Sequence, residues 1–132
     1  MIVLDTHALI WWAVGDERLS VNAGEAIRRE LEDGGQVLVS AITAWEIAML
    51  VERGRLVLTM ELGEWLSAVE SIEGVALVPI TPQLAMQSVQ LPGEFHKDPA
   101  DRMIVALARE FNAAVITADD KIRRYAHVKS VW

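Results

Sequence analysis

The fold is most easily inferred from the segment Met1-Ile2-Val3-Leu4-Asp5-Thr6-His7-Ala8-Leu9-Ile10. Residues 2–4 form a short apolar run that predicts a strand, and residues 6–14 predict a helix that follows it directly. An apolar run that does not alternate with polar residues is typical of a strand buried on both faces, as in a parallel sheet covered by helices. Asp5 stands at the point where the strand passes into the helix.

The same alternation of strand and helix continues along the chain. Further strands are predicted at residues 37–39, 76–80, 114–117 and 128–131. Further helices are predicted at residues 22–33, 41–53, 61–71, 83–90, 99–111 and 120–125. This order predicts an α/β fold, a three-layer α/β/α domain with a central, mainly parallel sheet of about five short strands. We expect residues 1–132 to form one domain, since 132 residues with 52% hydrophobic content suffice for one core.

Composition excludes several classes of site. The chain has no cysteine, which excludes disulfides, zinc thiolate sites and a cysteine nucleophile. An acid comes before any long apolar stretch at the start, so we expect no signal peptide, no membrane span and a cytoplasmic protein. The net charge of −7 argues against holding nucleic acid by bulk electrostatics. The basic side chains best suited to phosphate contacts are Arg53, Arg55, Lys121, Arg123 and Arg124.

Asp5 and Asp119 both follow predicted strands. In a parallel sheet, ligands bind outside the carboxyl ends of the strands, where the chain enters the next helix. Each acid has a plainer explanation as the N-cap of the helix that follows it. Neither residue alone identifies a site.

Asp101 has the strongest claim to a function. Asp98 followed by Pro99 already supplies the cap of the helix at residues 99–111, since proline suits the first helical position and aspartate bonds the free amides. Asp101 therefore remains as a second carboxylate at the start of an apolar helix.

Glu46 has two explanations. Thr43 and Glu46 have the spacing of a capping box, in which the glutamate bonds back to the threonine amide. Alternatively, Ser40 caps a helix already running at Ala41, and Glu46 then lies inside it among apolar neighbours, where an unpaired charge is costly.

A bound cation would explain all of these acids together. If three or four carboxylates converge, each pair repels by about 4 kcal/mol at an effective dielectric near 20. A site made only of oxygen ligands suits a hard ion, Mg²⁺ or Mn²⁺. Such a site most naturally hydrolyses phosphodiesters.

The sequence resembles PIN-domain ribonucleases, specifically the VapC toxins of toxin-antitoxin pairs. Four segments in order carry the resemblance: Met1-Ile2-Val3-Leu4-Asp5-Thr6-His7, Ser40-Ala41-Ile42-Thr43-Ala44-Trp45-Glu46-Ile47, Asp98-Pro99-Ala100-Asp101-Arg102-Met103-Ile104-Val105-Ala106 and Ile116-Thr117-Ala118-Asp119. By position, the acids that match the family's catalytic, metal-binding quartet are Asp5, Glu46, Asp101 and Asp119. Candidates for supporting positions are Asp98, Thr117, Thr6 and Arg102.

The resemblance implies an endoribonuclease that depends on Mg²⁺ or Mn²⁺ and hydrolyses RNA phosphodiester bonds. It also implies a homodimer and a cognate VapB-like antitoxin as partner. Two alternatives stay open: a receiver-like metal-binding module that accepts a phosphoryl group, and an interaction protein whose acids only cap helices.

Histidine and tryptophan are expected to be structural. The metal mechanism needs no imidazole, so His7 and His96 are not placed in it. Trp11, Trp12 and Trp45 are interpreted as core or interface anchors, and base stacking is the less favoured alternative because they lie inside helices among apolar neighbours.

Overall fold

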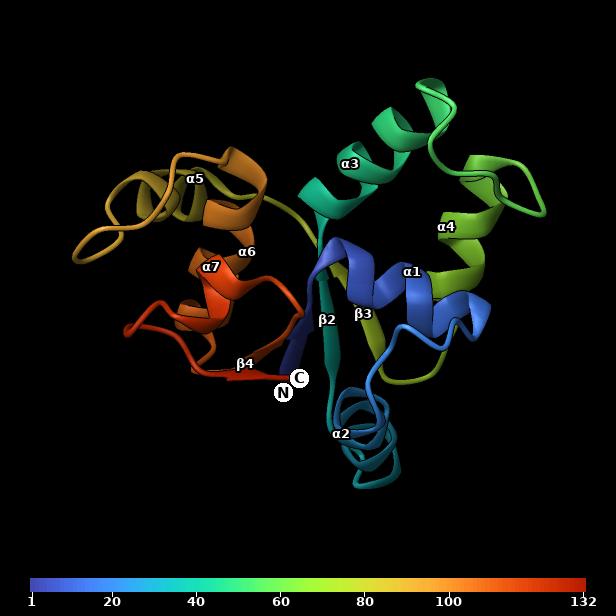
Figure 1. Cartoon of the computed structure of the whole chain (residues 1–132), viewed down its shortest axis with the longest axis horizontal. Coiled ribbons are helices and arrows are strands. Elements are labelled where there is room, and N and C mark those ends of the chain that lie inside the picture. Colours follow the sequence, from blue (N-terminus) through green and yellow to red (C-terminus); the bar gives the residue numbers. More distant parts are fainter.

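The computed structural model describes residues 1–132 and contains one sheet of five parallel strands. The strands are β1 (Ile2–Leu4), β2 (Val37–Ser40), β3 (Val75–Val78), β4 (Ala114–Ile116) and β5 (Ser130–Val131). Their order in the sheet is β3-β2-β1-β4-β5, so the first strand lies in the middle (Figure 1). The predicted α/β/α class is confirmed.

Seven helices connect and cover the strands. They are α1 (Thr6–Val14), α2 (Val21–Glu32), α3 (Ala41–Glu52), α4 (Leu62–Glu70), α5 (Pro82–Val89), α6 (Pro99–Glu110) and α7 (Asp120–Arg123). Most predicted ends agree with these or differ by one residue. The strand predicted at 76–80 ends at Val78, because Pro79 has no amide hydrogen for the ladder.

The sheet separates two hydrophobic clusters. One packs α1, α2, α3 and α4 against one face, around Leu4, Ile27 and Ile47. The other packs α6 and α7 against the opposite face, around Val3 and Ile104. Neighbouring residues of β1 thus point into different clusters, as a strand with helices on both sides requires. Figure 1 shows α5, α6 and α7 on one side of the strands, with α1, α2 and α4 on the other.

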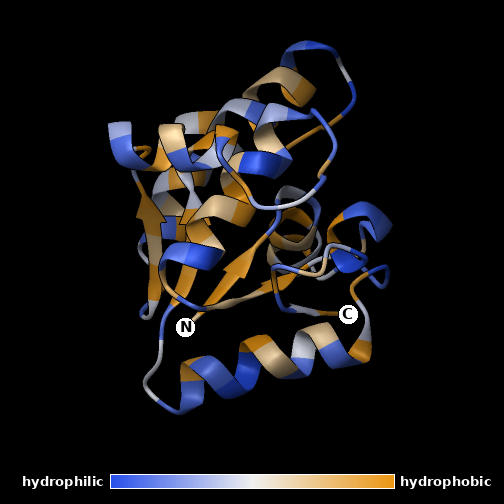
Figure 2. Ribbon diagram, turned by 90° about the vertical axis from the view of Figure 1, so that its left-hand side faces the viewer, coloured by the Kyte–Doolittle hydropathy of each residue, from blue (hydrophilic) through white to orange (hydrophobic).

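Figure 2 shows the same layering by hydropathy: the strands are hydrophobic, and α2 alternates between polar and apolar residues along its length. No helix here combines the length and the apolarity needed to cross a membrane.

The register aligns the carboxyl ends of three strands. Leu4 of β1 lies opposite Val39 of β2 and Ile116 of β4. The residues that follow, Asp5 and Thr117, therefore emerge side by side at one edge of the sheet. This edge is where the acidic side chains gather.

Candidate functional site

One open pocket at the carboxyl edge of the sheet brings all the predicted acids together. It has a volume of about 540 Å³ and is lined by Asp5, Thr6, His7, Trp11, Glu46, His96, Asp98, Asp101, Ala118, Asp119 and Lys121. These residues follow β1 and β4 or come from α1, α3, α7, the start of α6 and the segment just before α6. Segments more than a hundred residues apart in the chain thus meet at one place.

Asp5 is both a helix cap and a member of the site. It is 7% exposed, and its Oδ1 accepts a hydrogen bond of 2.8 Å from the Ala8 amide. Its Oδ2 accepts a hydrogen bond from the Thr117 hydroxyl. Burial raises the pKa of Asp5, against the lowering effect of the Thr117 and Ala8 hydrogen bonds. Its second oxygen is thus bonded to Thr117, which follows β4, and is not used for capping.

Glu46 is not part of a capping box. Ser40 caps α3 by accepting a hydrogen bond of 3.2 Å from the Ile42 amide, as the second explanation required. The Thr6 hydroxyl donates to Glu46 Oε1 and lies 3.0 Å from the buried Thr43 hydroxyl. Burial raises the pKa of Glu46, and the charges of Asp98 and Asp5 raise it further.

Asp101 lies where the cap argument placed it. Asp98 Oδ1 accepts a hydrogen bond of 3.0 Å from the Asp101 amide, so Asp98 holds the start of α6. The Asp101 carboxylate lies 3.0 Å from His96 Nε2. Burial is the largest cause that raises the pKa of Asp101 to about 7, followed by the charge of Asp98 and then of the other pocket acids.

Asp119 completes the group from the end of β4. It caps the short α7 by accepting a hydrogen bond of 2.8 Å from the Lys121 amide. Its own amide donates to the Thr117 hydroxyl at 3.0 Å. Thr117 is fully buried and holds both Asp5 and Asp119, which supports the position predicted for it beside the acids.

His96 joins the acids, whereas the sequence led us to expect a structural histidine there. One ligand atom each of His96, Asp101 and Asp119 lie within 4.8 Å of one another. That spacing and donor set fit a divalent cation bound by two carboxylates and one imidazole. The only sequence signal was the place of His96 two residues before Asp98.

The structure does not bring Arg102 to the acidic pocket. Its guanidinium donates to the carbonyl oxygens of Ser88 (2.7 Å), Val89 (3.2 Å), Phe95 (2.9 Å) and His96 (3.1 Å). Arg102 therefore does not contact the acid beside it in sequence. It fixes the loop between α5 and α6 that carries His96.

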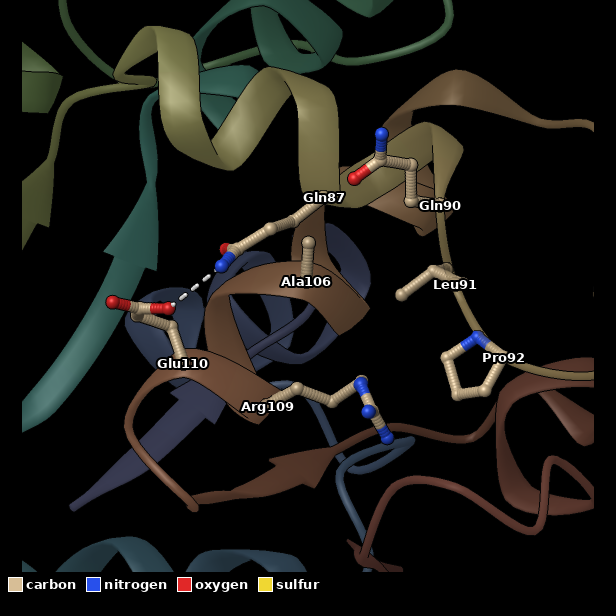
Figure 3. Close-up of a pocket in the computed structure, with 7 residues that line it drawn as sticks. All are labelled: Gln87, Gln90, Leu91, Pro92, Ala106, Arg109 and Glu110. Atoms are coloured by element: carbon tan, nitrogen blue, oxygen red, sulfur yellow. Dashed lines mark hydrogen bonds between the residues drawn. The ribbon is translucent and has the colours of Figure 1, made fainter.

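A second pocket lies at the other end of α6 and has different chemistry. Figure 3 shows it between α5 and α6, with Gln87 bonded to Glu110 at 3.1 Å. Arg109 on the same wall donates to the His127 carbonyl at 2.5 Å. One acid and one base face this pocket, both held by neighbours, so like charges do not accumulate there.

Comparison with known proteins agrees with this geometry. Residues 2–128 match the model of the PIN domain family. The chain is 37% identical to Ribonuclease VapC22 of Mycobacterium tuberculosis over 133 aligned residues, covering 99% of this chain and 98% of that one.

Two solved structures share the fold. VapBC2 from Rickettsia felis, bound to a DNA fragment from its promoter, has a TM-score of 0.71 at 14% identity, covering 98% of this chain and 97% of that one. A toxin-antitoxin complex from Klebsiella pneumoniae has a TM-score of 0.63 at 19% identity, covering 97% and 95%. The family match, the near full-length relative and the pocket at the strand ends agree: the chain belongs to the PIN-domain family and is a VapC-type member of it.

Proposed function

We propose that this protein is a VapC-type endoribonuclease that hydrolyses RNA phosphodiester bonds with Mg²⁺ or Mn²⁺. The observation that carries the proposal is a pocket faced by five carboxylates and a single lysine side chain. Family membership favours this function over the receiver-like module. The acids assigned to the cation and to catalysis are Asp5, Glu46, Asp101 and Asp119.

A divalent cation bound there would activate water for attack on the phosphorus and stabilise the leaving oxygen. The protein's own contribution is to fix its ligands in advance. Thr6 orients Glu46, and Thr117 orients Asp5 through its hydroxyl. His96 lies against Asp101 and adds a nitrogen donor to the set. Buried hydroxyls that each serve a carboxylate leave little freedom for those side chains, which favours a preformed site.

Asp98 has a separate role in this proposal. It starts α6 and turns Asp101 toward the pocket, while its charge adds to the field that attracts a cation. Asparagine caps a helix about as well as aspartate, so Asp98→Asn should retain more cleavage than Asp101→Asn.

The proposed setting follows from the relatives. One is named a ribonuclease, and another belongs to a toxin-antitoxin complex. We therefore propose a VapB-like antitoxin as inhibitor, a homodimer as the assembly and the cytoplasm, where RNA is made, as the location.

The direct test is cleavage of transfer, ribosomal and messenger RNA by the purified chain with Mg²⁺, with Mn²⁺ and with a chelator. We expect cleavage with either ion and none with the chelator. Asp5→Asn should be inactive yet folded, because asparagine replaces the cap. Full cleavage by this variant, or by the chelated wild type, would contradict the proposal.

The remaining alternative, that the acids only cap helices, predicts something different. A protein of that kind would show no metal-dependent change in melting temperature. A rise with millimolar Mg²⁺ or Mn²⁺ would count against it.

A further inference from the structure

One wall of the acidic pocket is aromatic. His7 and Trp11 are four residues apart on α1, so they project from the same face of that helix. Both side chains line the pocket that contains the acids. Their ring centroids are 5.7 Å apart and the rings are inclined by 48°. His7 is exposed and Trp11 is partly exposed.

The Trp11 ring is held in place by two other side chains. The Trp132 ring packs against it with a centroid distance of 5.7 Å, and the Arg18 guanidinium lies 5.1 Å from its ring centre. Arg18 is itself fixed by Asp16, through bonds of 2.7 Å and 3.1 Å to the two carboxylate oxygens. The indole is thus held in place with a positive charge over one of its faces, next to a strongly negative pocket.

The acidic pocket cannot attract an RNA strand by charge alone. The protein carries a net charge of −7, and phosphates are repelled by the carboxylates until a cation is bound. Binding energy must therefore come from other contacts, which include the basic side chains suited to phosphate and any surface on which a base can stack. Stacking of bases on aromatic rings is the contact that single-stranded nucleic acids commonly use, and it does not depend on net charge.

We propose that His7 and Trp11 form a subsite for one unpaired nucleobase of the RNA, next to the phosphodiester in the acidic pocket. The inference rests on the proposed ribonuclease function and adds a base-binding contact to it. A base within a duplex is already stacked on both sides, whereas an unpaired base in a loop or single strand is free to stack on a protein ring.

The test measures binding of short, unstructured, fluorescently labelled RNA in Mg²⁺ to chains that carry Asp101→Asn, which prevents cleavage. Adding Trp11→Leu should weaken binding about tenfold, as expected for the loss of one base–aromatic contact. Trp11→Phe should recover most of that loss. The matched control is Trp12→Leu: Trp12 is the next residue of α1 and packs on the same core, but it does not line the pocket.

A second set of RNAs, each with one nucleotide lacking its base, isolates the stacking contact. At one position the Trp11→Leu variant and its parent should bind the abasic RNA equally, since no base is left to stack. Equal binding by Trp11→Leu and Trp12→Leu, or an undiminished Trp11 effect at every abasic position, would overturn the subsite. If Trp11→Leu does not fold, His7→Ala at the exposed end of the wall should show the same dependence on the base, and its failure to do so would also overturn the proposal.

The outcome separates this inference from the function on which it rests. If the wild type cleaves RNA but the Trp11 variants bind as their parent does, only the base subsite is wrong. If the wild type cleaves no RNA in Mg²⁺ or Mn²⁺, the ribonuclease proposal fails, whatever the binding assay shows.

Discussion

The acids on the outer face of α2 and the acids in the pocket are treated in opposite ways by the fold. On α2, Arg28 lies one turn from both Glu25 and Glu32 and pairs with each. The hydrogen bond from Arg28 lowers the pKa of Glu25. In the pocket, burial and neighbouring carboxylates raise the pKa of Asp101 to about 7. The same chemical group, a carboxyl, is thus stabilised in its charged form on α2 and in its neutral form in the pocket.

The difference lies in where the neutralising charge comes from. On α2 the sequence itself provides an arginine at the right spacing, and the pairs are exposed and contribute little to stability. In the pocket the one cationic side chain, Lys121, cannot balance five acids. The fold keeps that charge available for a cation from solution, at a cost to the stability of the metal-free protein.

The largest expected effect is on activity. Asp101→Asn should lower RNA cleavage by at least about a hundredfold, since even residues that only orient metal ligands alter activity by about 10- to 100-fold. The matched change on α2, Glu25→Gln, removes one carboxylate charge of the same kind and should leave cleavage unchanged. Initial cleavage rates in Mg²⁺ measure both. Equal losses in the two variants would show that overall charge, not the pocket, controls the reaction.

Stability against pH should separate the two groups of acids next. The folded-state pKa of Asp101 lies above its ordinary value of 3.8, so the stability it contributes is present below about pH 4 and lost as the pH rises through about 7. The pKa of Glu25 is lowered, so the stability that Glu25 contributes is present above its ordinary pKa and is lost as the pH falls.

Urea unfolding in the presence of a chelator, repeated between pH 4 and 8, measures how the free energy of unfolding depends on pH. We expect the metal-free protein to lose about 2 kcal/mol over this range from Asp101, after allowing for solvent screening. Asp101→Asn should flatten that part of the profile and be more stable than the wild type at pH 7.5. A wild-type profile that rises steadily to pH 8 and is matched by the variant would contradict the raised pKa.

Cation binding should restore the stability that the metal-free protein loses when Asp101 ionises. An ion that binds only the folded state at ten times its dissociation constant stabilises it by about 1.4 kcal/mol, which corresponds to a shift of a few degrees in Tm. The Tm measured with Mg²⁺ or Mn²⁺ should therefore rise for the wild type and for Glu25→Gln. The same ions should raise the Tm of Asp101→Asn less, since that variant keeps the other pocket acids but lacks one charged ligand, and an equal rise there would place the ion elsewhere.

The smallest expected effect is that of His96. His96→Asn should weaken Mn²⁺ binding about tenfold and Mg²⁺ binding less, because imidazole is a better ligand for transition metals than for Mg²⁺. Calorimetric titration with each ion gives the two affinities. His127→Asn is the control, since His127 lies at the other end of α6 beside Tyr125. Identical affinities in wild type and His96→Asn would remove His96 from the ligand set.

The features that sequence reasoning recovered are those set by neighbours in the chain. The strand at residues 2–4 and the helix at residues 6–14 were predicted with the bounds that the structure has, because an apolar run, an aspartate cap and a helical run lie in direct succession. The same local pattern identified Asp98 as the cap of α6 and Asp101 as a second carboxylate that the cap does not need. Parallel topology then brought the strand ends together.

What the sequence could not show depends on distant partners. Arg102 bonds carbonyl oxygens up to fourteen residues away, and no local pattern distinguishes such an arginine from one at the surface. In the aromatic wall of the pocket, Trp11 packs against Trp132, which lies 121 positions later in the chain. β5 is two residues shorter than predicted, since it pairs only with β4, itself three residues long.

The central position of β1 has a consequence for how the protein is made. Asp5 and the Thr117 that orients it are separated by 112 positions, and β1 pairs with β4 on that side. During synthesis, these contacts cannot form until β4 and Thr117 have been added, long after the first strand and α1 have been made. A nascent chain that stops before β4 lacks Thr117 and Asp119, so a nuclease of this design becomes able to cut RNA only after β4 and the residues that directly follow it have been made.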